Sequence, residues 1–438
     1  MWARRFRLTC AKLLAAACLF SVQARSQQQI SNRDRGRAQE MLRVVADVVR
    51  RFYYDPKFHG VDWDAKVAEI NQKIEKANSF NMALSEIGAL LDSLNDSHTF
   101  FLPPQHLNRY DYGWQYQMIG EQCFLIRVHP GSDAQAKGLT PGDEILAIDG
   151  YRPTRDNVWR MKYAYSVLRP QLGFRLLLQD PHGKRRQVDV AAAIHEEKKG
   201  NSIGPDIGDA VRQLQNQHHL MRARYEELSD QLIAVQFPAF MFSASEVDSI
   251  IDKARKYPAL IVDLRDNSGG SAETLKYLLG GVFDKEVKIA DRVGRKETKP
   301  EVAKPRHHQY SGKLVVLVDS SSASAAELFA RVVQIEKRGT VVGDRTSGSV
   351  MEAEHYHEQL VRDSVIYYGA SVTEWDLIMT DGKSLEHTGV TPDTIVLPTA
   401  QELAAGSDPV LARAAEILGV KLSAEQAGKL FPYEWPPD

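Results

Sequence analysis

The segment that most constrains the fold is residues 313–329, KLVVLVDSSSASAAELF. An apolar, β-branched run at 314–318 predicts a buried strand, and the small residues at 320–326 lead into a helical pattern. The turn between them delivers serine hydroxyls to a helix N-terminus, where free amides and the helix dipole favour negative charge. A serine at such a position is either a helix cap or a nucleophile, and this segment alone leaves both roles open.

The alternation of strand and helix extends over residues 230–400, which predicts a layered α/β core. A second buried strand, at 260–264, ends in the small-residue run Asn267-Ser268-Gly269-Gly270. Adjacent glycines let backbone amides approach a ligand, because no Cβ intervenes. Acyl transfer requires a nucleophile, a base and two donors for the tetrahedral oxygen. The two strand-to-helix junctions could supply the nucleophile and the donors, and the base must come from elsewhere in the chain.

The remainder of the chain divides into regions of different character. Residues 30–108 show helical periodicity and predict a small N-terminal α-helical domain. Residues 110–195 alternate short β-type runs with Gly- and Pro-containing turns, and residues 196–229 form a polar connection with one helical piece near 209–216. Residues 401–438 read as a C-terminal helical tail. The chain is therefore predicted to be a multidomain α/β protein.

The first 24 residues have the pattern of a secretory signal peptide. Four basic residues precede an apolar run at 13–22, and Val22-Gln23-Ala24 is a small-x-small cleavage pattern. The apolar run is too short to span a bilayer. We expect an exported protein, periplasmic or extracellular, with no stable membrane span after cleavage. A lipoprotein signal with Cys18 lipidated and an uncleaved anchor are the alternatives.

Composition and side-chain spacing limit the partners. The formal net charge of −2 gives no reason to expect a nucleic-acid partner. Cys123 is the single cysteine outside the signal segment, and its apolar surroundings predict a buried structural thiol. His355 and His357 alternate on one predicted strand face, but no third ligand stands at metal spacing. We therefore expect no metal and no cofactor.

The stretch VHPGSDAQAKGLTPGDEILAIDG, at 128–150, resembles the core signature of a PDZ domain. The resemblance implies a PDZ-like, β-rich domain that adds an extended peptide as an extra strand and holds its C-terminal carboxylate with backbone amides. The carboxylate loop is assigned to residues 112–115, YGWQ. A structural β-module without a ligand is the alternative.

Four motifs occur in order after the PDZ-like stretch. They are VDLRDNSGG, VDSSSASAAELFARVV, GDRTSGS and LEHTGVTPD. Together they resemble the C-terminal-processing and tricorn-core family of serine peptidases, and the resemblance covers nearly the whole chain after the signal segment. It implies a crotonase-like α/β catalytic core and hydrolysis of peptide bonds.

The resemblance also implies roles for individual residues. Ser324 matches the nucleophile, and its oxyanion hole would combine the amide of Ala325 with that of Gly269 or Gly270. In members with a Ser–Lys dyad a lysine follows the Thr-x-Gly turn, and this chain has Ser349 there instead.

The tricorn-like branch takes its base from an upstream Ser-His pair and adds a later acidic residue. Ser97 and His98 match that pair, and Glu386 matches the acid. His98 would then accept the Ser324 proton and return it to the leaving amine, while Ser97 and Glu386 support it.

The sequence therefore predicts a secreted or periplasmic serine endopeptidase that recruits protein or peptide substrates through its PDZ-like domain. Two alternatives stay open. One is a catalytically weak relative that binds peptides or other ligands. The other is a Ser–Lys peptidase with an unidentified lysine, such as Lys276 or Lys337.

Overall fold

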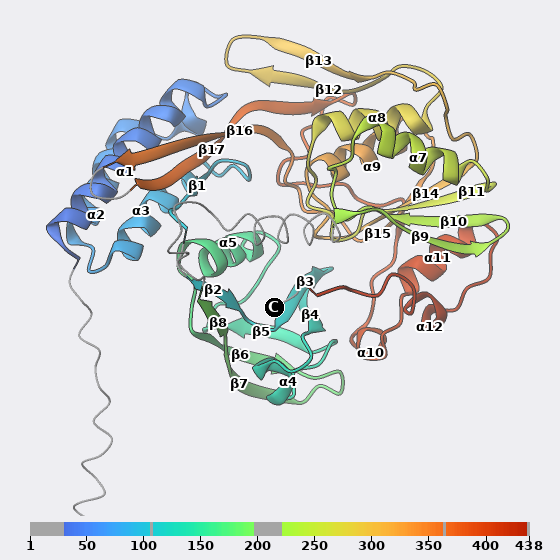
Figure 1. Cartoon of the computed structure of the whole chain (residues 1–438), viewed down its shortest axis with the longest axis horizontal. Coiled ribbons are helices and arrows are strands. Elements are labelled where there is room, and N and C mark those ends of the chain that lie inside the picture. The colour runs from blue at the N-terminus through green and yellow to red at the C-terminus, as the bar shows by residue number, and fades with distance from the viewer. Residues whose placement is uncertain (1–29, 106–107, 197–220, 362–364, 436–438) are drawn as a thin grey trace, which may run out of the picture.

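The computed structural model describes residues 30–105, 108–196, 221–361 and 365–435. The predicted signal segment and the helical piece near 209–216 lie outside these ranges. Figure 1 shows three bodies: N-terminal helices, an α/β core and a β-rich module beneath them. The long hairpin of β16 (Met351–Val361) and β17 (Val365–Met379) runs from the core toward the N-terminal helices.

Three helices form the N-terminal region, each preceded by a capping side chain. They are α1 (Asn32–Phe52), α2 (Trp63–Lys76) and α3 (Phe80–Asp92), capped by Ser31, Asp62 and Ser79. A short 3₁₀ turn, Phe58–Gly60, lies between α1 and α2. Their apolar faces pack together and against Leu360 and Tyr368 of the hairpin. The helical region is therefore completed by strands that belong, in sequence, to the core.

The chain enters the core sheet directly after α3. Strand β1 (Phe100–Leu102) pairs antiparallel with β17, with Phe100 opposite Ser371. This pairing fixes residues 96–99 against the core, because they are the link between α3 and β1.

The β-rich module is a five-stranded antiparallel sheet in the order β3-β4-β5-β6-β7. Its strands are β3 (Trp114–Ile119), β4 (Gln122–Val128), β5 (Glu144–Ile148), β6 (Gly173–Gln179) and β7 (Arg185–Ala191). Helices α4 (Asp133–Ala136) and α5 (Val158–Tyr163) and a π-helical turn, Ala164–Leu168, connect them. The pair β2 (Asn108–Asp111) and β8 (Ala193–Glu196) joins the two ends of the module. Strand β3 is an edge strand of this sheet.

The core is a six-stranded sheet in the order β18-β15-β14-β11-β10-β9. The strands are β9 (Arg224–Ser229), β10 (Leu232–Gln236), β11 (Ala259–Asp263), β14 (Lys313–Val318), β15 (Thr340–Gly343) and β18 (Thr394–Ile395). All neighbours are parallel except β9, which is antiparallel to β10.

Alternate residues of the central strands face opposite layers of helices. One layer holds α7 (Ala244–Ala254), α8 (Ala272–Val282) and α9 (Ala325–Ile335), packed on residues such as Val262 and Val316. The other holds α11 (Pro409–Ile417) and α12 (Ala424–Ala427), packed on residues such as Ile261 and Val315. Burial on both faces explains the continuous apolar runs of these strands.

A second sheet borders the core. Its order is β1-β17-β12-β13, and β16 pairs with β17. Strands β12 (Val287–Gly294) and β13 (Thr298–Ala303) form an antiparallel hairpin. Helix α10 (Ala400–Ala404) then leads to the C-terminal helices.

The β-rich module is fastened to the core beside the loop that follows β15. The Arg155 guanidinium pairs with Asp344 at 2.6 Å and donates to the Arg345 carbonyl oxygen at 2.8 Å. The Gly120 amide also donates to Asp344, at 2.8 Å. The position of the module is therefore linked to a loop that reaches residues 346–349.

The predicted elements are largely present, with two corrections. Residues 221–229 were assigned to a polar connection, but residues 224–229 form β9, because their backbone pairs with β10. The β12–β13 hairpin was not predicted, since its mixed sequence has little apolar alternation. Cys123 is buried as expected, and burial raises the pKa of its thiol to about 12.

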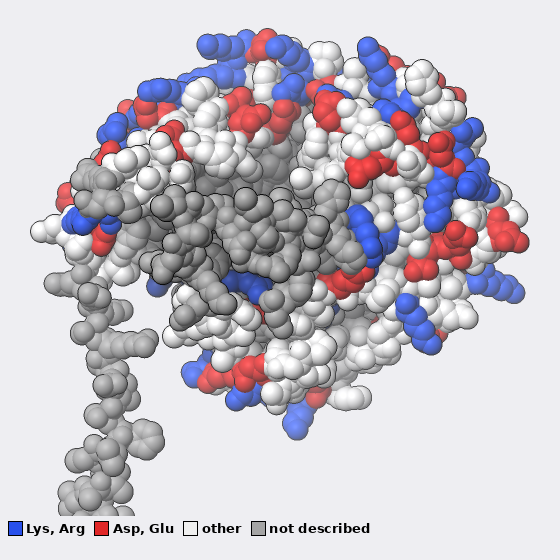
Figure 2. All heavy atoms as spheres, viewed as in Figure 1, with Lys and Arg blue, Asp and Glu red and all other residues white. Residues whose placement is uncertain are grey.

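Charged side chains are interspersed over the surface of the core and the N-terminal helices in the view of Figure 2. On this face of the described residues, neither sign forms a continuous strip. Among the residues described, no helix has both the length and the hydrophobicity needed to cross a membrane.

Candidate active site

The two small-residue junctions lie side by side at one edge of the core sheet. Strands β11 and β14 are parallel neighbours, so their carboxyl ends meet there. The Ala323 amide donates to the Asn267 carbonyl oxygen at 2.9 Å, and the buried Ser322 hydroxyl donates to the Leu264 carbonyl oxygen at 2.7 Å. These bonds join the two turns into one rigid unit.

Ser324 occupies a strained position at the start of α9. It is the residue before the first helical residue, and its φ of 54° and ψ of −120° are unusual for a residue with a side chain. Such a conformation costs roughly 1–3 kcal/mol and persists only where the surroundings enforce it. The Ser324 amide donates to the Ser349 carbonyl oxygen at 2.9 Å and to Glu327 Oε2 at 3.1 Å. The backbone of Ser324 is therefore held from two directions.

Glu327 is a fully buried carboxylate beneath Ser324. Besides the Ser324 amide it accepts hydrogen bonds from Thr346 Oγ1 at 2.5 Å, the Gly348 amide at 2.8 Å and the Ser349 amide at 2.9 Å. Burial raises its pKa to about 7, although these hydrogen bonds oppose the rise. The side chain ties the first turn of α9 to the 346–349 loop.

The predicted oxyanion donors lie beside Ser324, and they are not equivalent. A Cβ on Gly269 would lie 2.7 Å from Ser324 Cβ and 3.1 Å from the Ala325 nitrogen, so the glycine permits a close approach. The Gly269 amide donates to Asn267 Oδ1 at 2.8 Å and is thereby engaged. In the described parts of the chain, the amides of Gly270 and Ala325 have no such acceptor. Of the two glycines, Gly270 is therefore the one whose amide stays available for a ligand oxygen.

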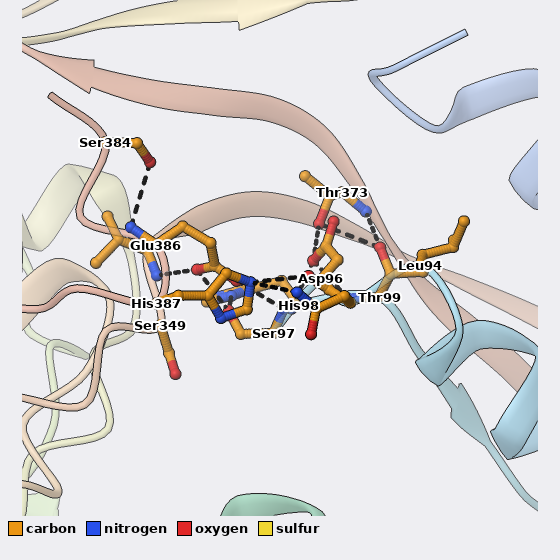
Figure 3. Close-up of polar contacts among 12 residues, drawn as sticks. Leu94, Asp96, Ser97, His98, Thr99, Ser349, Thr373, Ser384, Glu386 and His387 are labelled. Carbon is orange, nitrogen blue, oxygen red and sulfur yellow. Dashed lines mark hydrogen bonds and ion pairs between the residues drawn. The ribbon is translucent and has the colours of Figure 1, made fainter. Parts of the chain in front are cut away.

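The other predicted residues gather around Glu386 (Figure 3). The Ser97 hydroxyl lies 2.8 Å from His98 Nδ1 and donates to Glu386 Oε2 at 2.9 Å. The Ser97 amide donates to Glu386 Oε1 at 2.8 Å, and the Val350 amide donates to Oε2 at 2.8 Å. The structure thus brings Ser97, His98 and Glu386 together from positions up to 289 residues apart.

The hydroxyl of Ser97 has one proton, which constrains the tautomer of His98. If that proton is donated to the ionised Glu386, the Ser97 oxygen must accept from His98 Nδ1–H. His98 Nε2 then carries the lone pair, as a general base requires. Burial lowers the pKa of His98 below its ordinary value; the Asp96 carboxylate opposes this and the His355 ring adds to it. Burial raises the pKa of Glu386.

Asp96 fixes the backbone of the Ser-His pair. Its buried carboxylate accepts from the His98 amide at 2.8 Å, the Thr99 amide at 3.1 Å and Thr373 Oγ1 at 2.8 Å. Thr373 belongs to β17, so this turn is anchored on the core sheet.

One dipeptide, Ser349-Val350, connects the two halves of the site. Its Ser349 carbonyl oxygen accepts from the Ser324 amide, and its Val350 amide donates to Glu386. No direct hydrogen bond joins Ser324 to His98 within the described ranges. Their pairing stays a prediction.

The lysines considered as alternative bases lie elsewhere. Lys276 pairs with Glu273 at 2.8 Å and with Glu301 at 2.7 Å. Lys337 follows α9 at the end opposite to Ser324. At the position of the family's lysine, the Ser349 hydroxyl lies 2.9 Å from the Ser347 hydroxyl.

The two histidines of β16 show no metal-binding arrangement. The rings of His355 and His357 are 6.4 Å apart, and His355 also lies against Phe100, at 6.3 Å. Over the described ranges, no group of three or more His, Cys, Asp or Glu side chains could hold a metal ion.

Sequence reasoning missed Glu327 and Asp96 as parts of the site. Glu327 stands three residues after Ser324, the Ser-x-x-Glu spacing of a capping box, and that spacing was a usable signal. Asp96 directly precedes the Ser-His pair, but its contact with Thr373 depends on a tertiary pairing 277 residues away.

Two parts of the chain match known protein families. Residues 232–396 match peptidase family S41, and residues 36–80 match the tricorn protease C1 domain. A tail-specific protease of Haemophilus influenzae is 27% identical over 272 residues, which cover 58% of this chain and 36% of that protein. A putative tricorn protease homologue of Streptomyces coelicolor is 25% identical over 411 residues, covering 89% of this chain and 33% of that protein.

The fold has a solved counterpart. The structure of mature CPAF complexed with lactacystin has a TM-score of 0.63 at 16% identity and covers 85% of this chain and 95% of that one. The core of the chain, residues 232–396, matches peptidase family S41, in agreement with the resemblance to the C-terminal-processing and tricorn-core serine peptidases. The chain spans about a third of the length of the two curated relatives named above, at 36% and 33%.

Proposed function

We propose that the protein is an exported serine endopeptidase in which Ser324 is the nucleophile and His98 the general base. The observation that carries this assignment is the placement of the Ser97 hydroxyl between His98 Nδ1 and Glu386. That arrangement orients the imidazole and leaves Nε2 available as a base. The resemblance to the family implies a crotonase-like architecture for this core.

In this proposal, acylation proceeds from the Ser324 hydroxyl. The Ser324 hydroxyl proton passes to His98 Nε2 as Oγ attacks the scissile carbonyl carbon. The carbonyl oxygen becomes an oxyanion, which the amides of Ala325 and Gly270 stabilise. His98 then gives its proton to the leaving amine, the C–N bond breaks, and an acyl-enzyme ester with Ser324 forms.

Deacylation repeats the steps with water. His98 accepts a proton from water, whose oxygen attacks the ester carbonyl, and the same two amides stabilise the second oxyanion. Collapse releases the carboxylic acid product and returns the proton to Ser324. Ser97 and Glu386 are positioning residues in this scheme, since they act through His98.

Substrate recruitment is assigned to the β-rich module as a PDZ-like domain. Its edge strand β3 faces a cavity of about 370 Å³ that also borders α5, and the cavity is lined by aromatic residues and Lys162. An extended peptide can add to such an edge. In the 112–115 loop the Gly113 amide already donates to Asp111 at 2.8 Å. A ligand carboxylate would depend on the neighbouring amides and on the Lys162 cation.

The test compares wild type with Ser324→Ala and His98→Ala on a fluorescently quenched unfolded protein. Ser324→Ala should lose at least about 10⁴-fold in turnover and His98→Ala at least about 10³-fold, and both should keep the wild-type unfolding temperature. A serine-directed phosphonate should label wild type and spare Ser324→Ala. Full turnover by His98→Ala would favour a lysine base and contradict our assignment. An unreactive Ser324 in wild type would favour a ligand-binding relative.

A further inference from the structure

The C-terminal segment, residues 431–435, leaves the core and crosses to the β-rich module. Figure 1 shows the dark red trace running from the C-terminal helices toward β3 and β4. The segment has no regular secondary structure. Its sequence, Phe-Pro-Tyr-Glu-Trp, alternates large aromatic residues with small or charged ones. The catalytic scheme above does not use it.

Two aromatic side chains of this segment contact the module. The Tyr433 hydroxyl accepts a hydrogen bond from Gln115 Nε2 of β3 at 2.6 Å. The Arg127 guanidinium of β4 lies 4.0 Å from the centre of the Tyr433 ring. The Trp435 ring stacks on His129, with centres 4.5 Å apart and an interplanar angle of 17°. The segment therefore lies against the edge strand β3 and its neighbour β4.

Contacts with the core hold the other side of the segment. Glu434 pairs with Arg222 at 3.4 Å and with Arg224 at 3.8 Å. The Arg224 guanidinium also donates to the Pro432 carbonyl oxygen. The segment is thus a strap that bridges the core and the β-rich module.

Tyr433 is part of the wall of the cavity beside β3. The same cavity is lined by Trp114 and Tyr116 of β3 and by Lys162 of α5, whose ammonium group lies 5.0 Å from the Tyr116 ring. Because β3 is an edge strand, this cavity is where an added peptide strand would lie. A peptide entering it would meet the Tyr433 side chain.

The strap is held by contacts that can be released. Tyr433 is 36% exposed, and its polar and cation–π contacts involve surface residues. Interactions of this kind are individually weak. Release of the strap would uncover the groove without opening the hydrophobic core of the module.

We infer that residues 431–435 are a resident intramolecular ligand of the groove between β3 and α5, and compete with extended peptides for it. Tyr433 packs on Arg127 and Trp435 stacks on His129. Glu434, which lies between them in sequence, pairs with Arg222 and Arg224. This inference rests on the proposed peptide-binding role of the module. It assigns the groove a built-in competitor that lowers its affinity for substrate.

The expected size of the effect follows from tethering. A flexible tether gives a segment an effective concentration of about 1 mM. If the free segment binds with a Kd of about 0.1 mM, the attached strap weakens a competing peptide about tenfold.

The experiment uses the full chain and the synthetic peptide FPYEWPPD, labelled at its N-terminus, in fluorescence polarisation. The double variant Tyr433→Ala/Trp435→Ala should bind this peptide about tenfold more tightly than wild type. A peptide with the same two alanines should bind neither protein. As a matched control, Tyr367→Ala, which removes a 70% exposed tyrosine from β17, should keep the wild-type affinity.

Equal affinities in wild type and the double variant would overturn the inference. A double variant that loses thermal stability without gaining affinity would show that the strap is structural. With an unfolded protein substrate, KM should fall about tenfold with kcat unchanged, and an unchanged KM would contradict the competition. If neither protein has peptidase activity, the polarisation measurement still decides the inference, so the two failures are distinguishable.

Discussion

The two halves of the candidate site are built in different ways. The Ser324 half consists of two neighbouring strand-to-helix turns, a strained backbone and a buried carboxylate three residues into the helix. The His98 half brings together three segments that are distant in sequence, namely 96–98, 349–350 and 386. The first half is organised by local backbone geometry, and the second by hydrogen bonds that exist only when separate regions are docked.

This difference has a mechanical consequence. Ser324 is fixed by the sheet, by Glu327 and by the 346–349 loop, so its geometry does not depend on the docking of the N-terminal helices. His98 depends on the docking of the N-terminal helices through β1 and β17, and on the loop that carries Glu386. We expect changes in the groups that support Ser324, such as Glu327, to affect stability and catalysis together, and changes in the second half to affect catalysis more than stability.

Loss of the nucleophile gives the largest expected effect. Ser324→Ala should reduce kcat by at least about 10⁴-fold, because no other group can form the acyl-enzyme. Relief of backbone strain is not expected, since alanine has a Cβ as well. The free energy of unfolding in urea should change by less than about 0.5 kcal/mol. If Ser324→Ala retained turnover, Ser324 would be excluded as the nucleophile. The comparison between the two halves of the site would then fail as well.

Crowding of the nucleophile should have the next largest effect. Gly269→Ala would place a Cβ 2.7 Å from Ser324 Cβ at a φ of +93°. We expect turnover to fall about 10²-fold or more, because the oxyanion donors and Oγ would shift together. The matched control is Gly419→Ala, with a similar φ of +85° and no atom within 4 Å of the added Cβ. Equal losses in both variants would assign the effect to backbone strain alone.

Glu327 and Glu386 allow a direct test of the comparison between the two halves of the site. In Glu327→Gln the side-chain NH₂ group can take the place of Oε1, where Thr346 Oγ1 can accept from it and the Gly348 amide loses its acceptor. Because this site is fully buried, we expect a cost of about 2–3 kcal/mol of unfolding free energy. In Glu386→Gln one such conflict arises, at the Ser97 amide, and about 1–2 kcal/mol is expected. Urea unfolding measures both. The reverse order would contradict the view that the nucleophile half carries the larger share of stability.

The pH profile should respond to the surroundings of His98, with the smallest effects. Activity requires neutral His98, so kcat/KM should fall as pH decreases through its pKa, which burial places below the ordinary value. Asp96→Asn removes a charge that raises this pKa, so the acidic limb should move to lower pH. His355→Gln removes a ring that lowers the pKa of His98, so the acidic limb should move to higher pH. We expect each variant to shift the acidic limb by less than about one pH unit. If both variants shifted it in the same direction, the assignment of His98 as the base would be contradicted.

Much of the architecture was predictable because its signals are local. The apolar run at 314–318, the small-residue turn and the Pro409 start of α11 each specify an element through burial, turn chemistry or capping. The β12–β13 hairpin gave no such signal, because its stability comes from pairing with β17. Peptidase family S41 was likewise recognisable from four short motifs in order.

The sequence by itself determined the Ser324 turn, the glycine pair beside it and the identities of Ser97, His98 and Glu386 as candidates. Only the tertiary structure decided which glycine amide is free, that Glu327 lies beneath Ser324, and that Ser97 links His98 to Glu386. Local elements follow from dihedral preferences and burial periodicity within a few residues. Contacts across 289 residues follow from strand pairing and docking, which no local pattern encodes.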